Sequence, residues 1–480
     1  MTDLKKPVIV WFRQDLRLAD NPALQAAAAT GAPVLPVYIL DDEAPGAWKP
    51  GGASRWWLHH SLTSLARDIE QLGGRLIFQK GPAQSCLEAL IEDVGADAVF
   101  WNRQYEPWAR KRDEAIKSAL KTADVKARSF NGSLIVEPWD IATKAGAPYK
   151  VFTPFWRSLK AGHAPSEPSD RPDALTFQDY KGGCALEALK LLPTKPDWSG
   201  GLDDNWTPGE AAAHGRLGQF LQHSVTAYSD RRNLPAEHGT SKLSPHLHFG
   251  EISPRQVWHA VKRSDHAQSE GADTYLSEIA WREFSYNLLY HFPDLPEANF
   301  QSKFDGFEWT GQEKDLEAWR RGRTGYPIVD AGMRELWATG WMHNRVRMIV
   351  ASFLIKDLMI DWREGEAWFW DTLVDADLSS NSASWQWTAG SGADAAPYFR
   401  VFNPVGQSEK FDPDGDYLRM WLPELTKLPN KAIHAPWMAD ASVLRQAGVR
   451  LGETYPEPIV DHGEARKRAL AAFEKIKDSA

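Results

Sequence analysis

Residues 7–40, PVIVWFRQDLRLADNPALQAAAATGAPVLPVYIL, hold two short apolar runs separated by an amphipathic stretch, and this alternation continues to about residue 130. Three further apolar runs follow, RLIFQK at 75–80, DAVFWN at 97–102 and VKARSF at 125–130. Helical patterns lie between the runs, including residues 54–72 and 107–120. Near-continuous apolar strands that alternate with helices are typical of a parallel sheet covered on both faces. We therefore predict a doubly wound α/β domain over residues 1–132.

The rest of the chain predicts a linker and a second domain. Residues 133–205 are rich in Pro, Gly and Asp and lack a sustained period, which indicates a long ordered linker on the surface. Helical periodicity then dominates, so we predict a helical domain over 206–480. The first strand is followed by no G-x-G-x-x-G and the chain holds no P-loop motif, so a ligand of the α/β domain must bind in another way.

Composition excludes several classes of protein. The 480 residues are 43% hydrophobic and 25% charged, which predicts a globular protein. The longest apolar runs are far short of the roughly 20 residues of a membrane-spanning helix, and the start resembles no signal peptide, so we expect a cytoplasmic protein. Cys86 and Cys184 stand far apart without metal-ligand partners, which predicts neither a disulfide framework nor a zinc site.

The charge of the chain limits where nucleic acid could bind. The formal net charge is −9, and residues 206–480 carry 30 basic against 38 acidic side chains. Phosphate binding depends on clustered Lys and Arg, so a DNA site in this domain requires a local basic patch. The chain also contains 23 Trp, a residue that is used for large buried contacts, stacking and interfaces.

Three motifs in the helical domain carry side chains suited to chemistry. GTSKLSP at 239–245 offers hydroxyls and backbone N–H groups that can hold a pyrophosphate, although an ordinary helix-capping turn has the same composition. EIAWREF puts Glu278, Trp281 and Arg282 on one face of an apolar helix, where they either line a polar cavity or form a surface ion pair beside a core Trp.

The third motif combines a helix with a loop. MHNRVRMI repeats the spacing with Asn344, Arg347 and Met348, and DADLSSN supplies Asp375, Asp377 and Asn381 where a helix begins. The aspartates lack the terminal Glu of a complete calcium loop, so we predict no metal and favour a buried pair between Arg347 and a loop aspartate.

These motifs together resemble the DNA photolyase and cryptochrome family over nearly the whole chain. The segments that carry the resemblance are WFRQDLRLADNPAL, GTSKLSP, WREF, GYPIVDAGMREL, GWMHNRVRMIVASFL, DWREGE and NSASWQWTAGSGADAAPYFRVFNP. The resemblance implies an α/β antenna domain, a linker and a helical domain that holds a non-covalent, U-shaped FAD.

Carried onto matching positions, the resemblance names the flavin site. The residues at the phosphates and ribitol would be Tyr228, Thr240, Ser241, Lys242, Leu243 and Ser244. Arg347 would pair with Asp375, and Asp377 and Asn381 would lie at the isoalloxazine ring. The remaining residues implied for the cofactor pocket are Glu278, Trp281, Arg282 and Asn344.

The implied reaction is light-driven repair of cyclobutane pyrimidine dimers, in which excited reduced FAD donates an electron to a dimer extruded from the duplex. Glu278, Asn344 and Met348 would be the catalytic set, and Trp281 and Trp387 would supply aromatic walls. Arg232, Arg345 and Arg400 would contact DNA phosphates, although solvated or ion-paired arginines are an equal reading. Trp385, Trp362 and Trp309 would carry electrons from the surface to the flavin.

Other members of the fold remain open as alternatives. A cryptochrome photoreceptor uses the same flavin for signalling, but often carries a C-terminal extension that is not apparent here. A (6-4) photolyase would need a histidine pair, whereas this sequence has Asn344 where that family has His. A simple flavin electron carrier or oxidase would leave the residues at 278–282 unexplained.

We expect UV-damaged DNA to be the binding partner of this protein. We expect neither a membrane nor an obligate protein partner, and we expect the protein to be a monomer.

The antenna chromophore is the least determined part of the prediction. Glu106 in NRQYEP resembles a folate-contacting acid of some bacterial members, which favours methenyltetrahydrofolate with a deazaflavin as the alternative. Arg13, Asp41 and Arg55 follow or adjoin strand ends, where a ligand of an α/β sheet binds. Each of the four could equally form a surface salt bridge.

Overall fold

The chain folds into two compact units in a computed structural model that describes residues 5–395 and 399–477. The sheet unit comprises Met1–Thr226, Ser241–Pro293 and Val374–Leu378, and the helical unit comprises Ala227–Thr240, Asp294–Leu373 and Ser379–Ala480. Residues 396–398, inside the last segment quoted for the family resemblance, lie outside the described residues. The predicted domain boundaries at 132 and 205 stay a prediction.

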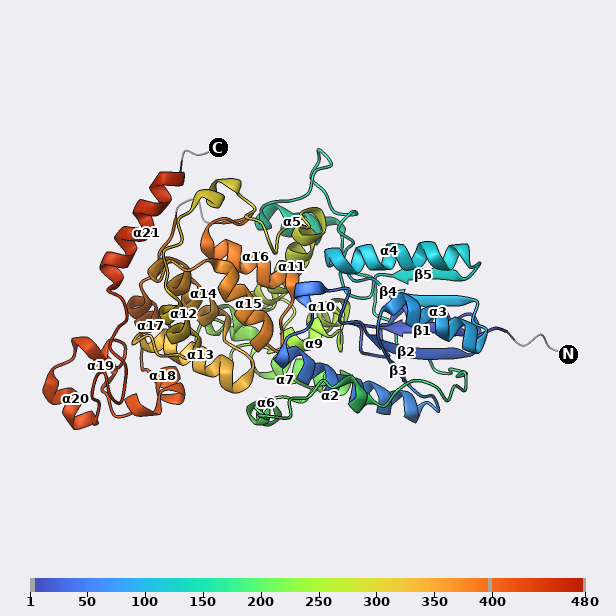
Figure 1. Cartoon of the computed structure of the whole chain (residues 1–480), viewed down its shortest axis with the longest axis horizontal. Helices are drawn as coiled ribbons and strands as arrows, with labels where there is room; N and C mark the ends of the chain where they lie inside the picture. Colours follow the sequence, from blue (N-terminus) through green and yellow to red (C-terminus); the bar gives the residue numbers. More distant parts are fainter. Residues whose placement is uncertain (1–4, 396–398, 478–480) are drawn as a thin grey trace. The chain divides into compact units, whose positions relative to one another are not determined.

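The sheet unit contains the predicted five-stranded parallel sheet, in the order β3-β2-β1-β4-β5 (Figure 1). Its strands are β1 Val8–Phe12, β2 Val34–Leu40, β3 Ile77–Lys80, β4 Ala98–Asn102 and β5 Lys126–Phe130. Every neighbouring pair is parallel, with Val8 opposite both Val34 and Ala98. β1, β2 and β4 are buried at every position, because both faces of the sheet are covered, and this is why they read as continuous apolar runs.

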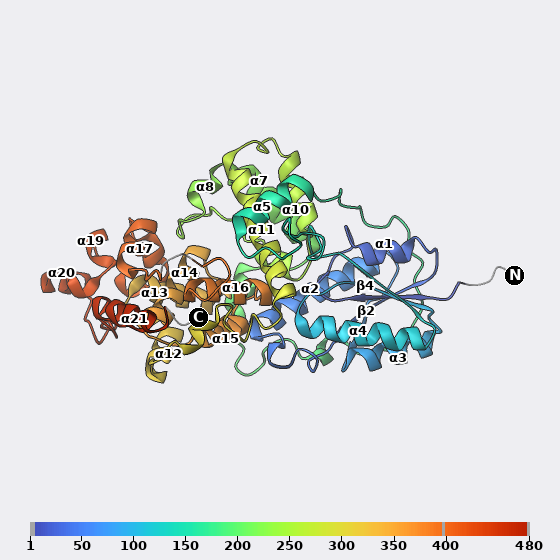
Figure 2. The same ribbon diagram turned by 90° about the horizontal axis from the view of Figure 1, so that it is seen from above.

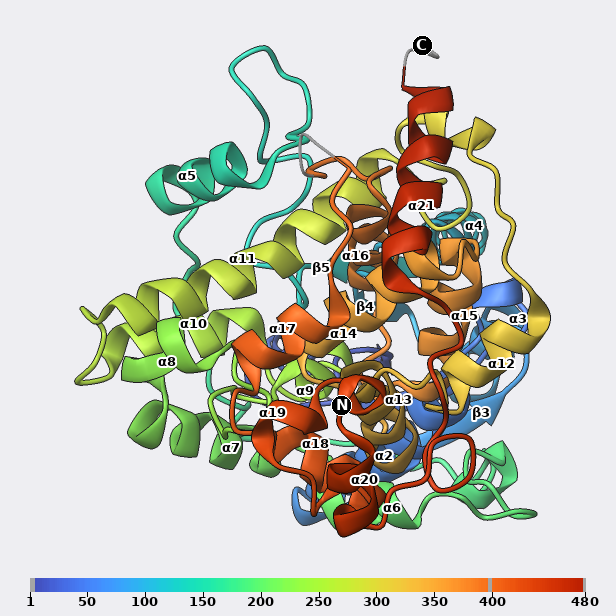
Figure 3. The ribbon, with the colours of Figure 1, turned by 90° about the vertical axis from the view of Figure 1, so that its left-hand side faces the viewer.

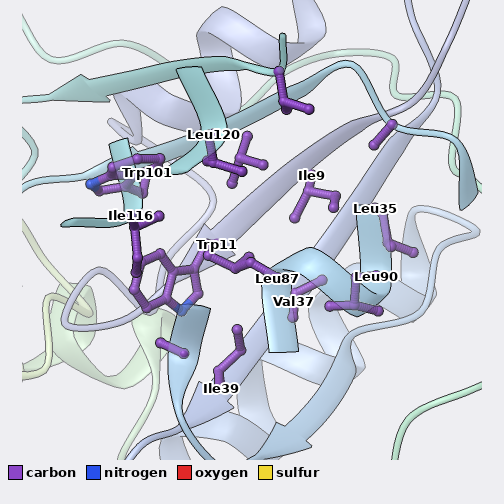
Figure 4. Close-up of a cluster of buried hydrophobic side chains, with 14 of the residues drawn as sticks. Ile9, Trp11, Leu35, Val37, Ile39, Leu87, Leu90, Trp101, Ile116 and Leu120 are labelled. Atoms are coloured by element: carbon purple, nitrogen blue, oxygen red, sulfur yellow. The ribbon is translucent and has the colours of Figure 1, made fainter. Parts of the chain in front are cut away.

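Helices cover both faces of this sheet. Ile9, Trp11, Val37 and Trp101 belong to a buried cluster that packs the strands against α3 (Ala83–Val94) and α4 (Pro107–Thr122) (Figure 4). α1 (Pro22–Ala28) lies on the opposite side of the strands from α3 and α4 (Figure 2). α2 (Gly52–Gln71) buries Trp56 and Trp57 completely.

The predicted linker contains little regular structure but is attached to the sheet. It includes α5 (Phe152–Gly162), η2 (Leu186–Leu189) and α6 (Gly200–Asn205). Isolated bridges pair Phe177 with Val34 and Cys184 with Phe78, so this segment is held along the sheet by backbone hydrogen bonds.

The remaining helices of the sheet unit are α7 Glu210–His223, α9 Ser244–His248, α10 Pro254–Arg263 and α11 Glu270–His291. α5 and α10 both pack along α11 (Figure 3). Glu251 fastens α2 to this group, because its carboxylate accepts the Trp57 indole N–H at 3.0 Å and the Gly209 N–H at 2.8 Å and also contacts His246. All of Glu251 and His246 is buried.

The helical unit is built almost entirely from helices. They are α8 Tyr228–Arg231, α12 Glu313–Arg320, α13 Pro327–Thr339, α14 Asn344–Ser352, α15 Trp362–Thr372, α16 Leu378–Ala389, α17 Pro404–Phe411, α18 Asp416–Trp421, α19 Asn430–Ile433, α20 Ala441–Ala447 and α21 His462–Ile476. α14 passes into a single π-helical turn, η5 (Phe353–Asp357), which buries Lys356 and Asp357. None of the helices in the described part of the chain has the length and apolar character needed to cross a membrane.

Candidate functional site

The loop GTSKLSP has a backbone suited to binding an anion. Lys242 has φ 50°, in the left-handed region, and Leu243 returns to the right-handed region before α9 begins at Ser244. Such an alternation turns successive N–H groups toward one concave side, a geometry that binds phosphates. Ser241 Oγ accepts hydrogen bonds from the Tyr275 hydroxyl at 3.0 Å and from the Leu243 N–H at 3.3 Å. The loop is therefore fixed to α11 through Tyr275.

The predicted face of α11 is present, and two of its residues are anchored within the sheet unit. The Trp281 ring stacks on Phe152 with centroids 3.8 Å apart and planes at 10°. Arg282 donates to the Ser133 carbonyl at 2.8 Å and to Glu283 at 3.2 Å. Glu278 lies on the same helix and is half-buried. The face thus combines a carboxylate with an indole whose orientation is set by a stacked phenyl ring.

Asp377 lies in a buried polar cluster of the same unit. The Tyr286 hydroxyl donates to Asp377 Oδ2 at 2.5 Å, and His248 Nδ1 lies 3.6 Å from that oxygen. Burial raises the pKa of Glu106, and the negative charge of Asp377 raises it further. The cluster therefore joins Asp377, predicted at the flavin ring, to Glu106, predicted at the antenna. Asp375 lies two residues earlier, in the turn before α16, and is also buried.

In the helical unit, Asn381 is held by a buried glutamate. Asn381 Nδ2 donates to the Glu366 backbone carbonyl at 3.0 Å, and the Ser382 hydroxyl contacts Glu366 Oε1 at 2.5 Å. Burial raises the pKa of Glu366 to about 8, so this side chain is largely protonated at neutral pH. The α15 backbone thus orients the amide group that the family resemblance places near the flavin.

The three arginines predicted to contact DNA lie near one another. Burial lowers the pKa of Arg345, and the positive charges of Arg232 and Arg400 lower it further, as expected of neighbouring cations. Arg345 donates to Asn233 Oδ1 at 2.6 Å and lies 4.4 Å from the Phe411 ring centroid. We call Arg232, Arg345 and Arg400 the arginine patch. It is a local cluster of positive charge of the kind that DNA binding by an acidic domain requires.

Residues of the predicted dimer pocket border this patch. Arg345 Nη1 lies 3.6 Å from the Met348 sulfur, and Asn344 is exposed at the start of α14. Trp387 and Arg400 line a cavity of about 20 Å³ together with Lys356.

The predicted flavin-site residues of the helical unit are also placed by the structure. Arg347 donates from Nε to the Met342 carbonyl at 2.8 Å. Arg232 lies 5.5 Å from the ring centroid of buried Tyr228. Thr240, at the end of the helical unit's first segment, is half-buried.

Two of the three tryptophans of the predicted electron chain are fully enclosed. Trp385 packs against Phe369 with ring centroids 5.0 Å apart, and a Cβ on Gly365 would lie 2.1 Å from its Cη2 atom, so α15 passes directly over the indole. Trp362, at the start of α15, donates to Asn299 at 3.0 Å. Trp309 is half-buried and lies 4.6 Å from the Phe307 ring centroid. These positions run from the protein interior to its surface.

The predicted antenna residues already make structural bonds. Arg13 binds both oxygens of Asp113 at 2.8 and 3.0 Å and also contacts the Asn102 carbonyl. The Asp41 carboxylate accepts backbone N–H groups of residues 43, 44 and 83. Arg55 pairs with Asp42 at 2.6 Å. The assignment of these residues to a chromophore stays a prediction.

Sequence reasoning missed four polar residues that contact or adjoin predicted site residues within each unit. They are His248, Tyr286, Glu366 and Ser382. His248 stands three residues after the GTSKLSP loop, and Tyr286 lies one helical turn beyond Arg282, which are weak signals of their role. Glu366 is the last residue of the segment DWREGE. The segment is rich in charged residues, which predicts exposure, so the burial of Glu366 could not be predicted from it.

Comparison with known proteins identifies the class to which this fold and site belong. The model for the FAD binding domain of DNA photolyase matches residues 275–475, and the DNA photolyase model matches residues 8–173. A deoxyribodipyrimidine photo-lyase of Agrobacterium fabrum is 55% identical over 98% of both chains. The chain belongs to the DNA photolyase family, and the predicted family and fold class are confirmed.

Two other similar proteins delimit the comparison. The crystal structure of a bacterial class III photolyase from Agrobacterium tumefaciens superposes with a TM-score of 0.96 and 54% identity, covering 100% of this chain and 99% of that one. Cryptochrome-1 of Arabidopsis thaliana is 40% identical over 98% of this chain and 70% of its own length. The similarity therefore extends to a cryptochrome but is greater to the two Agrobacterium photolyases.

Proposed function

We propose that this chain is a deoxyribodipyrimidine photo-lyase that uses light to repair cyclobutane pyrimidine dimers in DNA. The similarity to a photo-lyase at 55% identity over 98% of the chain carries this proposal. The α11 face with Glu278 and the arginine patch support it from the geometry, because they provide a carboxylate for the lesion and cations for the DNA backbone. A cryptochrome function is the alternative, and it has the weaker similarity.

The residues present fit an FAD molecule bound by the described loops and helices. The left-handed backbone at Lys242 and the hydroxyls of Thr240, Ser241 and Ser244 suit the pyrophosphate. The FAD, when bound and reduced, supplies the electron on excitation. Asn381 presents its amide in the orientation fixed by the Glu366 carbonyl, and Asp377 is oriented by Tyr286. Arg347 and Asp375 are proposed to pair beside the ring.

The chain's own residues then act on the DNA lesion. The arginine patch binds phosphates flanking the dimer and holds it out of the duplex. Glu278 forms hydrogen bonds to the pyrimidine edge and shares the charge of the reduced dimer, while Trp281, Trp387 and Met348 exclude water. Asn344 completes the pocket. The available groups include no paired histidines on α14, which fits a cyclobutane dimer better than a (6-4) product, whose repair must move a hydroxyl group and its proton.

Glu278→Ala should lower the repair of cyclobutane dimers per absorbed photon by about tenfold or more, the value of one hydrogen bond to a charged group. FAD should remain bound. The measurement is dimer repair under blue light against a dark control, with flavin content determined for each preparation. Glu270→Ala, at an exposed position of the same helix, is the matched control and should repair normally.

A repair assay of the wild-type protein on each purified lesion distinguishes the candidate functions. Repair of the (6-4) product alone would overturn the assignment, and repair of neither lesion would favour the cryptochrome reading. Asn344→His should not confer (6-4) repair by itself, because a single histidine does not supply the pair that this chemistry requires.

Trp385→Phe should slow photoreduction of oxidised FAD by at least about tenfold in the presence of an external reductant. Electron hopping through short aromatic steps is faster than one long step, and Trp385 is the buried first step proposed for the chain to Trp362 and Trp309. Flash photolysis gives the rate. Trp198→Phe, a half-exposed position in the predicted linker, is the control. Equal rates in Trp385→Phe and wild type would show that electrons reach the flavin by another path.

The proposal extends to the antenna chromophore and the cellular setting. Methenyltetrahydrofolate is the first choice for the light-harvesting chromophore and a deazaflavin the second. A cytoplasmic location, and action on damaged DNA without an obligate protein partner, also stay predictions.

A further inference from the structure

The buried cluster behind Asp377 has a feature that the proposed repair reaction does not explain. Two carboxyl groups, Glu106 and Asp377, lie in one enclosed region of the sheet unit and are 4% and 8% exposed. They are far apart in the sequence but are brought together by the start of α4 and the end of the 374–378 segment. Tyr105, the neighbour of Glu106, packs against Tyr286 with ring centroids 6.0 Å apart, and Tyr286 bonds Asp377. The two carboxyl groups therefore belong to one buried cluster, where two negative charges disfavour each other.

The two carboxyl groups have very different surroundings. Asp377 Oδ2 receives the Tyr286 hydroxyl at 2.5 Å and has His248 Nδ1 at 3.6 Å, and the positive charge of Arg282 acts on it as well. His248 Nδ1 is buried and has no hydrogen-bond partner among the residues that the structure describes, so it is available to Asp377. Asp377 therefore has a hydroxyl donor and the positive charge of Arg282, both of which stabilise an ionised carboxylate.

Glu106 has much less to stabilise a charge. The one hydrogen bond that the described residues give to its carboxylate comes from the N–H of its neighbour Tyr105, at 3.1 Å. No cation of the described residues is within ion-pair distance of it. Burial is the largest influence on the pKa of Glu106 and raises it, and Asp377 raises it further. The backbone hydrogen bond and the charges of His248 and Arg13 oppose this rise only in part.

We propose that Glu106 and Asp377 hold a single negative charge between them, with Glu106 protonated and Asp377 ionised. Glu106 is then a positioning residue that keeps the flavin site from acquiring a second negative charge. This inference rests on the proposed function, because it is FAD that Asp377 is proposed to contact. The ligand affected is an anionic cofactor, since FAD carries a pyrophosphate, and additional negative charge nearby weakens its binding.

The sign of the pH dependence follows from the protonated state of Glu106. A carboxyl with a raised pKa is neutral below that pKa and becomes charged as the pH rises through it. FAD affinity of the wild type should thus fall on the alkaline side. The ionisable groups that surround this region are Arg13, Arg103, Tyr105, Glu137, His248, Arg282, Glu283, Tyr286 and Asp377. Glu283 also has a pKa raised by burial, to about 7, so its contribution must be separated.

Glu106→Gln separates these contributions, because glutamine has the shape of the protonated acid and cannot ionise. The dissociation constant of FAD should rise several-fold with pH in the wild type and should rise clearly less in Glu106→Gln. Glu70→Gln, at an exposed position of α2, is the control and should follow the wild type. An identical pH profile in Glu106→Gln and wild type would overturn the inference.

A second measurement does not depend on repair activity. Carbon-13 NMR of glutamate carboxyl groups in the purified full-length chain should show one signal that is lost in Glu106→Gln and that titrates above the ordinary glutamate range. In Asp377→Asn the same signal should titrate at lower pH, because a neighbouring negative charge has been removed. An ordinary pKa for Glu106, or one unchanged in Asp377→Asn, would refute the shared charge. A preparation that folds but never binds flavin would instead refute the proposed function.

Discussion

Replacing Asp113 by Ala should lower the free energy of unfolding of the sheet unit by about 3–5 kcal/mol, the usual loss when one partner of a buried ion pair is removed. Asp113 binds Arg13 through two hydrogen bonds of 2.8 and 3.0 Å and accepts the Trp101 indole N–H at 3.1 Å. It also pairs with Arg112 at 2.9 Å. Arg13, at the carboxyl end of β1, is only 6% exposed. Without Asp113 its positive charge would therefore be buried and uncompensated.

Urea unfolding followed by tryptophan fluorescence measures this loss, because Trp11 and Trp101 lie in the same core. Asp97→Ala, at an exposed position before β4, is the matched control and should change stability by less than about 0.5 kcal/mol. A loss no larger than the control's in Asp113→Ala would show that solvent or a shifted side chain compensates Arg13.

The pH dependence of this contribution has a definite sign. Although burial opposes it, the charges of Arg13 and Arg112 hold the pKa of Asp113 below its ordinary value of 3.8. The stabilisation is therefore fully present above that ordinary value and is lost as the pH falls toward the lower pKa of the folded protein. Wild-type and Asp113→Ala proteins should become more similar in stability only in strong acid.

The strands and the two-face burial of the sheet could be predicted from the sequence, because a strand enclosed on both faces is apolar at every position. All five predicted strands are present within two residues of their expected limits. Within the helical domain predicted over 206–480, α14 ends at Ser352 and the chain continues as the π-helical turn η5, a change that helical periodicity does not predict. Lys356 and Asp357 in that turn bond to the Arg400 carbonyl and to His462, partners too distant in sequence to be foreseen.

The polar network of the site was the least predictable part. Helical spacing correctly placed Glu278, Trp281 and Arg282 on α11, but it could not show that Arg282 donates to Ser133, 149 residues earlier. Tyr286 and Asp377 are 91 residues apart, and only the folded chain brings them together. Spacing predicts neighbours within one helix, whereas contacts between elements depend on tertiary packing.

Arg347→Ala should abolish stoichiometric FAD binding, and this is the largest functional effect that we expect from a single substitution. Arg347 donates from Nε to the Met342 carbonyl at 2.8 Å, which fixes the base of the guanidinium, and its Cζ lies 5.9 Å from the Trp341 ring centroid. We propose that the remaining N–H groups pair with Asp375, which is 8% exposed. Loss of one partner from a buried pair costs about 3–5 kcal/mol, and because Arg347 is half-buried we expect the lower end, an affinity about 100-fold lower.

The ratio of flavin to protein absorbance in purified Arg347→Ala, with circular dichroism to establish that it is folded, measures this effect. Arg347→Lys keeps the charge but loses the planar guanidinium, so it should bind FAD with intermediate affinity. Arg466→Ala, at an exposed position of α21, is the control and should retain FAD. Asp375→Asn should lose FAD as well, since it removes the other charge of the proposed pair. A well-folded Arg347→Ala protein with one FAD per chain would show that Arg347 serves the packing of α14 and not the flavin.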